Sequence, residues 1–211
     1  MIEVLYEDKD LLVIFKPYGL SSGDLTERIK EEKGIDVFLV HRLDQVVSGI
    51  MLLAKNSKSA ALLTEEINND SFNKEYLALV KGDIQEAGIL EGYIYHDRNR
   101  NRSYMVKKRN GSKYAKLAYK LIARKEDISL IVVKLFTGRT HQIRCQLSSM
   151  GCPLLGDGKY GSKVNGEVKL FSYHLSFKHP FKKEIMDFYK LPTMKQQWLI
   201  FEEEINKLEI K

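Results

Sequence analysis

One short stretch of the chain combines a carboxylate with basic side chains: His41-Arg42-Leu43-Asp44, followed by Ser48-Gly49. The wholly apolar run 50–54 comes next and predicts a buried strand. The four residues would therefore form a loop anchored to the core, and such a loop holds a reactive group rigidly. An Asp at this position is usually a turn or cap residue. Beside an arginine that keeps it ionised, Asp44 is also a candidate nucleophile.

A second arginine-rich stretch follows the most apolar predicted strand. Residues 128–136 are apolar on both faces apart from Ser129 and Lys134, which predicts a central strand. The strand runs directly into Thr137-Gly138-Arg139. A buried carboxylate must be paired to stay ionised. Arg42 and Arg139 are therefore the two candidate partners of Asp44.

The segment 96–109 is strongly basic and has little apolar content. It holds Arg98, Arg100 and Arg102 and then Lys107-Lys108-Arg109, a composition that a core segment does not have. Two interpretations stay open. The segment is either a solvated surface loop or an edge that contacts phosphate groups.

Composition limits the possible classes of protein. The 211 residues, 44% of them hydrophobic, fit one domain or two small subdomains. The formal net charge of +6 suggests a polyanionic partner without establishing one. Two cysteines, Cys145 and Cys152, imply no disulfide framework. With no signal peptide and no apolar run of ~20 residues, the sequence predicts a cytoplasmic protein without membrane contact.

Several familiar sites are disfavoured. The segment 156–163 resembles a phosphate-binding loop, but it lacks Gly-Lys-Ser/Thr in that order and no apolar strand leads into it. We interpret it as a structural turn. The five histidines are scattered, and the two cysteines lack zinc-finger spacing. A metal site is therefore possible, but nothing in the sequence supports one.

The predicted elements must hold these residues in place. Strands are expected at 2–6, 11–15, 50–54, 74–81, 88–95, 114–123, 128–136, 169–177 and 182–188. Helices are expected at 24–33 with Asp24 as a cap and Gly34 as the stop, from Asn56 or Ser57 to Asn68, from Ile143 onward, and at 193–208. This mixed order does not support a doubly wound fold. It predicts an α+β fold with a largely antiparallel sheet.

Five groups of residues, in chain order, resemble the motifs of the RluA-type pseudouridine synthases. The match covers nearly the whole chain. The groups are Lys16-Pro17 with Gly19-Leu20; His41 to Asp44 with Ser48-Gly49 and 54–56; 74–80; 137–144 with Gly151, Pro153 and Gly156-Asp157; and His174-Leu175 with His179-Pro180.

The resemblance implies an enzyme that isomerises uridine to pseudouridine in ribosomal or transfer RNA, with neither cofactor nor metal. Asp44 matches the catalytic aspartate of the family. Tyr76 matches the tyrosine that stacks on the target base, and Arg139 matches the arginine that pairs with the aspartate. The implied fold is a single catalytic domain over 1–211, a monomer built of two tightly joined subdomains with flanking helices and a central cleft.

The resemblance also implies how RNA is bound. The target uridine must be flipped out of the RNA, and Arg42 matches a family arginine that can fill the vacated space. We expect His41, Arg98, Arg100 and Arg102 to contact the substrate as well. The family's small N-terminal RNA-binding module is not expected here.

The sequence departs from the family pattern after Asp44. Gln45-Val46-Val47 stands where the family commonly has Arg, an acidic residue and Thr. This departure motivates an alternative function: an RNA-binding or RNA-folding protein that keeps the fold with little catalysis. Intact Asp44, Tyr76 and Arg139 argue against that alternative.

Overall fold

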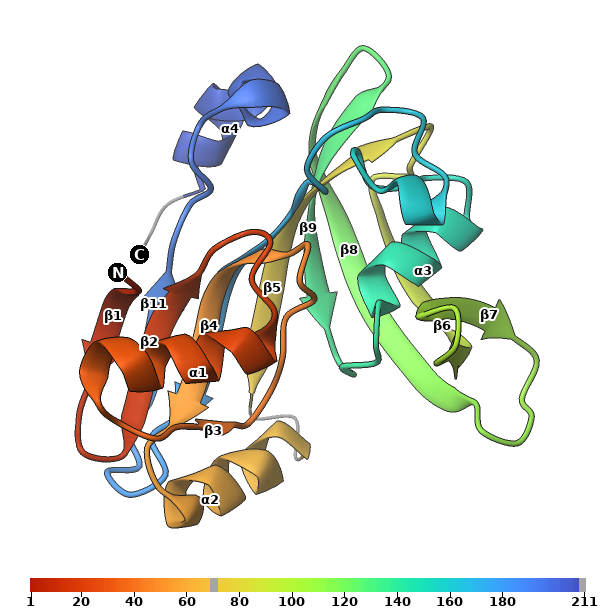
Figure 1. The fold of residues 1–211 in the computed structure, drawn as a ribbon. Coiled ribbons are helices and arrows are strands. Elements are labelled where there is room, and N and C mark those ends of the chain that lie inside the picture. The colour runs from red at the N-terminus through yellow and green to blue at the C-terminus, as the bar shows by residue number, and fades with distance from the viewer. Residues whose placement is uncertain (69–71, 209–211) are drawn as a thin grey trace. The chain divides into compact units, whose positions relative to one another are not determined.

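The computed structural model describes all residues except 69–71 and 209–211 (Figure 1). Contacts divide the chain into two compact units. Unit 1 consists of Met1–Lys74 and Ser172–Leu191, and unit 2 of Glu75–Phe171 and Pro192–Lys211. The prediction of one catalytic domain with a central cleft stays a prediction.

Unit 1 is built on six strands in the order β1-β2-β4-β10, with β3 paired to β4 and β11 paired to β10. The pairings β1–β2, β2–β4, β3–β4 and β10–β11 are antiparallel. The bounds are β1 (Glu3–Glu7), β2 (Leu11–Lys16), β3 (Phe38–Leu39), β4 (Ser48–Ala54), β10 (Leu170–Lys178) and β11 (Ile185–Tyr189). All but the two-residue β3 lie where the sequence predicts them.

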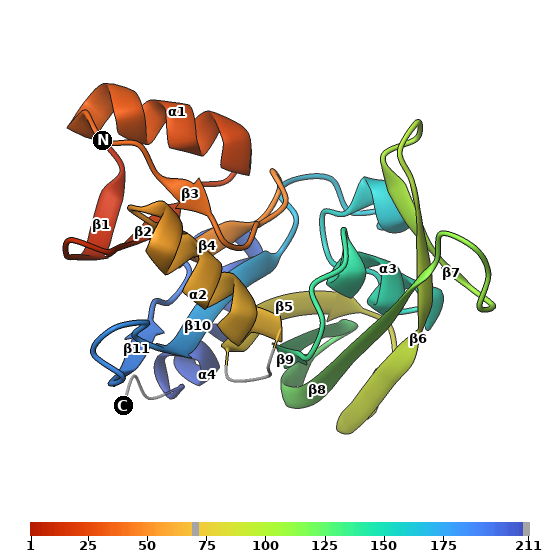
Figure 2. The same ribbon diagram turned by 90° about the horizontal axis from the view of Figure 1, so that it is seen from below.

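Two helices flank these strands (Figures 1 and 2). Helix α1 (Ser22–Lys33) ends at Gly34, as predicted, because Gly34 adopts the left-handed conformation with φ of 68°. The predicted cap Asp24 is wrong. Ser21 is the cap, with extended backbone and a side chain that accepts a hydrogen bond from the Asp24 N–H. Asp24 lies inside the first turn, where a carboxylate favours the positive end of the helix dipole.

Helix α2 (Ser57–Asn68) closes the apolar core of unit 1. Of the two predicted caps, Asn56 accepts a hydrogen bond from the Ser59 N–H at 2.8 Å. Leu63 is buried, and Ala60 and Ile67 pack beside it, so the predicted apolar face of the helix is confirmed. The core that they cover comprises Leu11, Val13, Ile50, Leu52, Ala54, Phe72, Leu175 and Phe177.

Unit 2 is a second run of strands in the order β5-β9-β8-β6-β7. Each neighbouring pair is antiparallel. The bounds are β5 (Asn73–Lys81), β6 (Ala87–Asp97), β7 (Arg102–Val106), β8 (Lys113–Lys125) and β9 (Ile128–Leu135). Strand β9 pairs on both sides, which confirms the predicted central position of the apolar run 128–136. Helix α3 (Gln142–Ser149) contacts β6 through Gln146, whose amide donates to the Leu90 carbonyl.

Two predicted segments of unit 2 differ in the structure. The basic segment 96–109 is not one loop, because β6 continues to Asp97 and β7 begins at Arg102 after a tight turn. The predicted helix 193–208 consists of a 3₁₀ helix η2 (Gln196–Phe201) and a short α4 (Glu202–Asn206). The cause is tertiary: the Ile200 carbonyl accepts a hydrogen bond from Lys125, 75 residues away in the sequence, and the side chains of Trp198, Phe201 and Ile205 are buried.

The predicted fold class is confirmed, since the chain is α+β with a largely antiparallel sheet. No helix among the residues outside 69–71 and 209–211 is both long and apolar enough to span a membrane.

Candidate functional site

The loop that carries Asp44 is fixed to its surroundings on both sides of the carboxylate. Before it, Ser22 of α1 donates a hydrogen bond to the Leu43 carbonyl at 3.0 Å. After it, the Val47 N–H donates to the Asp44 carbonyl at 3.0 Å and closes a turn. The side chains of Leu43 and Val47 are 3% and 2% exposed. The loop is therefore anchored to the core, as the sequence predicts.

His41 fastens the start of the same loop to β4. Its Nε2 accepts a hydrogen bond from the Leu52 N–H at 3.0 Å. Burial, with a smaller effect from the Lys74 charge, lowers the pKa of His41 to about 3. The ring is therefore neutral at pH 7. Its predicted contact with RNA stays a prediction, as does that of Arg42, whose side chain is exposed.

Lys16 is a member of this site that reasoning about chemistry from the sequence missed. Its side chain is 0% exposed, and its ammonium donates to the carbonyls of Pro17 at 3.1 Å and Leu20 at 2.7 Å. Burial lowers the pKa of Lys16 to about 8, and the negative charge of Asp44 opposes that shift. The only sequence signal for this role was the Lys-Pro pair in the first motif.

Tyr76 lies on β5, opposite Val133 of β9. It is 5% exposed. The alternation along β5 places it on one face of the strand with Ala78 and Val80, as predicted. The pairing of β5 with β9 fixes the backbone of Tyr76, whereas its stacking on a target base stays a prediction.

Arg139 is held in unit 2 by contacts of both its backbone and its side chain. Its Nε donates to the Tyr114 carbonyl at 2.8 Å, and its N–H donates to Oε1 of Gln142 at 3.0 Å. Gln142 in turn donates to the Lys116 carbonyl of β8. The structure places Arg139 and Tyr76 in unit 2 and Asp44 in unit 1. The pairing of Arg139 with Asp44 therefore stays a prediction.

The hairpin of β6 and β7 presents both basic and aromatic groups. Arg98 and Arg100 are exposed at its turn. Arg102 is half-buried, with its guanidinium carbon 5.5 Å from the centre of the Tyr104 ring. The guanidinium of Arg109 lies 4.2 Å from the centre of the Tyr95 ring. Cations for phosphates and rings for bases are the chemistry that single-stranded RNA requires.

A buried polar network ties this hairpin to the segment that bears Arg139. The Tyr160 hydroxyl accepts a hydrogen bond from the Ser103 N–H at 2.7 Å and lies 3.0 Å from Nδ1 of His141. The Ser103 hydroxyl donates to the Thr140 carbonyl at 2.6 Å. Because Ser103 follows Arg102 and Thr140 follows Arg139, a candidate RNA-contacting segment and the segment of a candidate catalytic arginine share one support.

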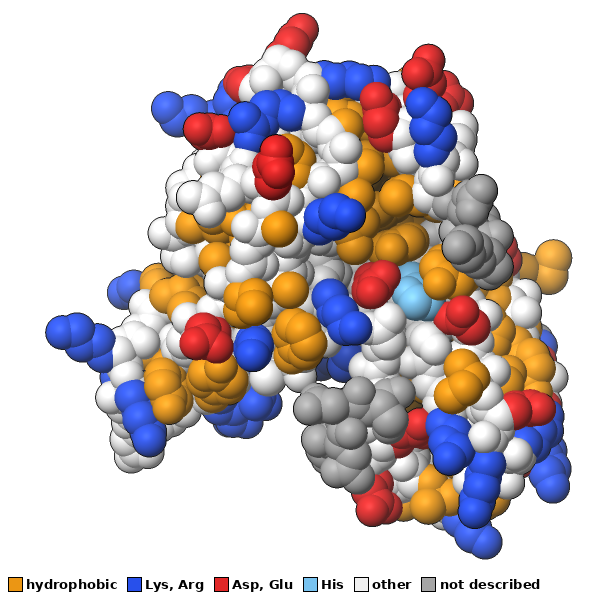
Figure 3. All heavy atoms as spheres, turned by 180° about the vertical axis from the view of Figure 1, so that it is seen from behind, with side chains coloured by type: hydrophobic (Ala, Val, Ile, Leu, Met, Phe, Trp, Pro, Cys, Tyr) orange, Lys and Arg blue, Asp and Glu red, His pale blue; other side chains and the backbone are white. Residues whose placement is uncertain are grey.

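Charges of both signs are mixed on one face of the molecule. Figure 3 shows Lys and Arg side chains mixed with Asp and Glu across the face seen from behind. The excess of positive charge is not gathered on that face. A net charge of +6 therefore does not by itself locate an RNA-binding surface.

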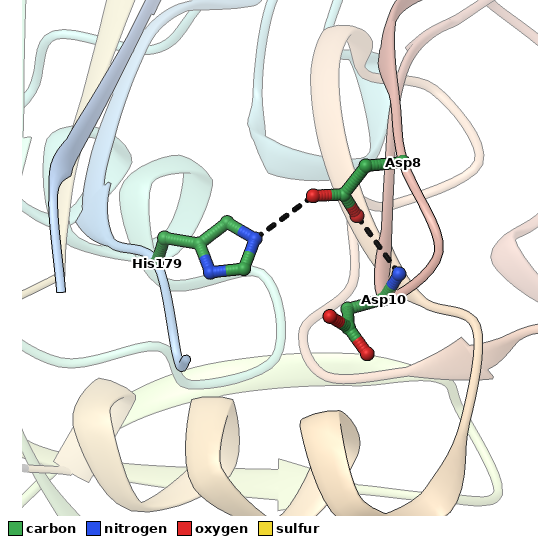
Figure 4. A group of neighbouring side chains, drawn as sticks. All are labelled: Asp8, Asp10 and His179. Atoms are coloured by element: carbon green, nitrogen blue, oxygen red, sulfur yellow. Dashed lines mark hydrogen bonds and ion pairs between the residues drawn. The ribbon is translucent and has the colours of Figure 1, made fainter. Parts of the chain in front are cut away.

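One cluster has the residue types of a metal site, but its hydrogen bonds do not suit a metal. Asp8, Asp10 and His179 offer ligand atoms within 4.8 Å of one another (Figure 4). Nδ1 of His179 accepts the N–H groups of Phe181 and Lys182, so the neutral ring carries its proton on Nε2. Nε2 then donates to Asp8 at 2.9 Å and has no lone pair for a metal. We interpret the cluster as a hydrogen-bonded connection between the β1–β2 turn, which carries Asp8, and the β10–β11 turn, which carries His179. This connection is called the latch below.

The segment 156–163 is a turn, as predicted. It contains the short 3₁₀ helix η1 (Gly158–Tyr160). The carboxylate of Asp157 accepts two hydrogen bonds from Arg144, at 2.7 and 2.8 Å. Both side chains are buried, so this ion pair fixes the turn to α3.

Comparison with known proteins adds independent findings. The family described as RNA pseudouridylate synthase matches residues 10–149. A protein named ribosomal large subunit pseudouridine synthase D, from Borreliella burgdorferi, is 34% identical over 90% of this chain and 66% of its own length. An uncharacterized RNA pseudouridine synthase from Haemophilus influenzae is 30% identical over 94% of this chain and 91% of its own length.

Solved structures agree on the fold. Human RNA pseudouridylate synthase domain containing 4 superposes with a TM-score of 0.77 and 23% identity, over 96% of this chain and 92% of its own. Human RNA pseudouridylate synthase domain containing 1 gives 0.78 and 21%, over 94% and 86%. The chain spans about two thirds of the length of the first of the curated relatives, as the 66% share shows.

Proposed function

This chain belongs to the RNA pseudouridylate synthase family, and from that membership we propose that it isomerises uridine to pseudouridine in RNA. The observation that carries the proposal is the family match over 10–149, which contains Asp44, Tyr76 and Arg139 together. The alternative, an RNA-binding protein with little catalysis, gives no reason for keeping all three residues.

Asp44 is the proposed catalytic carboxylate. In the reaction the bond from C1′ of the ribose to N1 of uracil breaks, and a bond from C1′ to C5 forms. The hydrogen on C5 leaves to water, and N1 gains a proton. A carboxylate that attacks the nucleoside or promotes departure of the base must be placed within reach of it. The anchored loop 41–47 supports this role, since it restricts where the Asp44 side chain can point.

Tyr76 and Arg139 are proposed to serve the same nucleotide. Flipping the uridine out of the RNA costs a few kcal/mol, roughly, and stacking on Tyr76 returns on the order of 1–3 kcal/mol. Arg139 would favour the ionised form of Asp44 through its opposite charge. Arg42 and His41 complete the proposed contacts near the flipped base, with Arg42 filling the space that the base leaves.

Ribosomal RNA is the proposed substrate class. The support is the name of the Borreliella burgdorferi relative, a synthase for the large ribosomal subunit. Arg98, Arg100 and Arg102 on the β6–β7 hairpin are proposed to contact phosphates outside the target nucleotide. On this proposal the enzyme acts as a monomer in the cytoplasm, where ribosomal RNA is found, and units 1 and 2 form one catalytic domain.

Release of tritium from RNA labelled at C5 of uridine tests the proposal. Ribosomal and transfer RNA transcripts would be incubated with the wild type, with Asp44→Asn, and with Asp36→Asn as a matched control. Asp36 is an exposed carboxylate of the same unit, 76% accessible. We expect release from ribosomal RNA by the wild type and by Asp36→Asn, and none by Asp44→Asn.

Two other outcomes would change the assignment. Release from transfer RNA alone would change the proposed substrate class from ribosomal RNA to transfer RNA. Binding of RNA by the wild type without release from either transcript would favour the RNA-binding alternative.

A further inference from the structure

Gln45, the residue directly after Asp44, makes an unusual two-way contact with Gly19. The Gly19 N–H donates to the Gln45 backbone carbonyl at 2.9 Å. In return, the Gln45 side-chain amide donates to the Gly19 carbonyl at 2.9 Å. The loop that carries Asp44 is therefore joined to the segment 17–20 by two hydrogen bonds at a single residue.

The other side of the segment 17–20 is held by Lys16. Its buried ammonium binds the carbonyls of Pro17 and Leu20, which flank Gly19. Gly19 itself has a φ of 85°, a left-handed conformation that glycine adopts without strain. The segment thus turns one set of backbone groups toward Lys16 and another toward Gln45.

We propose that the segment 17–20 is a clamp that positions Asp44, with Gln45 and Lys16 as its two positioning residues. The proposal rests on the proposed catalytic role of Asp44. Ser22 donates to the Leu43 carbonyl and Gly19 donates to the Gln45 carbonyl, so the residue before Asp44 and the residue after it each have a fixed backbone partner. Because the Asp44 loop is already fixed, the reaction does not have to include the entropic cost of ordering the carboxylate.

The clamp also gives a reason for the departure at 45–47. An arginine at position 45 would carry a charge on a longer side chain, whereas the neutral amide of Gln45 reaches the Gly19 carbonyl directly. Val47 replaces a hydroxyl by an apolar side chain and is buried, 2% exposed. On this interpretation the altered segment maintains the placement of Asp44, and it is compatible with full catalysis.

The substitution Gln45→Met tests the clamp, because it keeps the length of the side chain and removes only the amide donor. The backbone bond from Gly19 to Gln45 stays available. Loss of one neutral hydrogen bond predicts a single-turnover rate about 3–10-fold lower, with the Kd for RNA unchanged. Gln85→Met, at an exposed glutamine of unit 2, is the matched control and should change neither quantity.

Hydrogen exchange gives a second readout that needs no catalysis. We expect the amides of 41–47 to exchange about 3–10-fold faster in Gln45→Met than in the wild type, with no change in Gln85→Met. Unchanged exchange and an unchanged rate would overturn the clamp. A weaker Kd with a normal rate would also overturn it, because Gln45 would then be an RNA contact.

The two proposals fail separately. If the wild type releases no tritium, the proposed function fails, and the exchange of 41–47 still decides the clamp. If the wild type is active and Asp44→Asn is not, the proposed function holds whatever Gln45→Met does.

Discussion

Lys16 is the clearest case in which the surroundings of a residue, more than its type, set its chemistry. A lysine is rarely fully buried. Here the cost of burying the ammonium is offset by two backbone carbonyls and by the nearby charge of Asp44. Burial still lowers the pKa of Lys16 from 10.5 to about 8, which makes the stability of the protein depend on pH.

We expect the contribution of Lys16 to the free energy of unfolding to become more favourable as pH rises. Below pH 8 Lys16 is charged in both the folded and the unfolded state, and the folded state bears the full cost of burial. Between about 8 and 10.5 the folded state loses the proton first, so that cost disappears as pH rises. The free energy of unfolding of the wild type minus that of Lys16→Met should therefore rise by on the order of 1–3 kcal/mol from pH 7 to 10.5.

Urea denaturation of both proteins across that range measures the difference. Lys9→Met, at an exposed lysine, is the control and should show no such rise. A constant difference between wild type and Lys16→Met would contradict the buried, charged state of Lys16.

Tyr76 allows its ring and its hydroxyl to be separated. Tyr76→Phe keeps the stacking surface, so the Kd for RNA should not change. If the hydroxyl helps to remove the C5 proton, tritium release should slow by about 10²-fold or more. Single-turnover release and filter binding measure the two quantities. A normal rate would leave Tyr76 with stacking alone.

At the scale of elements, the sequence located strands better than turns and termini. Strands β2, β4, β5 and β9 carry continuous or alternating apolar residues, and their predicted positions hold. Strand β7 was missed because arginines and polar residues dominate its surroundings and hide its short alternation. The C-terminal helix was predicted too long. The spacing of apolar residues does not reveal that Lys125 donates a hydrogen bond to the Ile200 carbonyl.

The candidate site shows the same limit. Motifs identified Asp44, Tyr76 and Arg139 one by one, because each residue type is tied to its chemistry. They gave no sign that the Gln45 amide reaches Gly19 or that Ser103 and Tyr160 join two segments. Such interactions join residues that are far apart in the sequence. A single sequence does not show which distant residues lie close together in the folded protein.

The β6–β7 hairpin is the element expected to bind phosphates. Reversing the charges of Arg98 and Arg100 removes two exposed cations from its turn, so RNA affinity should fall and its dependence on salt should become weaker. The slope of log K against log salt should change by roughly 0.7 for each phosphate that the hairpin no longer binds. Titrations of labelled RNA at several salt concentrations measure it.

A matched pair controls for net charge. Lys9→Glu with Lys58→Glu makes the same change in charge at exposed positions of unit 1. If both pairs of substitutions changed RNA affinity and its salt dependence equally, the hairpin arginines would contribute only through the net charge of the protein.

At the scale of the molecule, unit 1 joins the beginning of the chain to a segment near its end. The latch of Asp8 and His179 makes that connection between the β1–β2 turn and the β10–β11 turn (Figure 4). Burial alone would raise the pKa of Asp8. Hydrogen bonds from the N–H groups of Asp10 and Leu11, from His179 and from Tyr6 outweigh burial and hold the pKa well below its ordinary value of 3.8.

The latch should therefore weaken in acid. A carboxyl group with a lowered pKa adds stability above its unfolded value, and that contribution is lost as pH falls toward the folded value. We expect Asp8→Asn to lower the free energy of unfolding at pH 7 and to differ less from the wild type as pH falls below about 4. Asp36→Asn should show a much smaller loss at pH 7, since its carboxylate is exposed. A difference that stays constant with pH would contradict the role of Asp8.

The pairing of β4 with β10 also affects how the protein is made. On the ribosome β4 emerges well before β10, and with roughly 100 residues between them and a synthesis rate of about 5–20 residues per second, its edge stays open for about 5–20 s. Part of that edge is covered early, because β3 pairs with Leu53 and the His41 ring accepts the Leu52 N–H. The apolar residues Ile50 and Met51 stay open and can pair with other nascent chains. From the order of the strands we therefore expect the unfinished chain to be prone to aggregation until β10 is made.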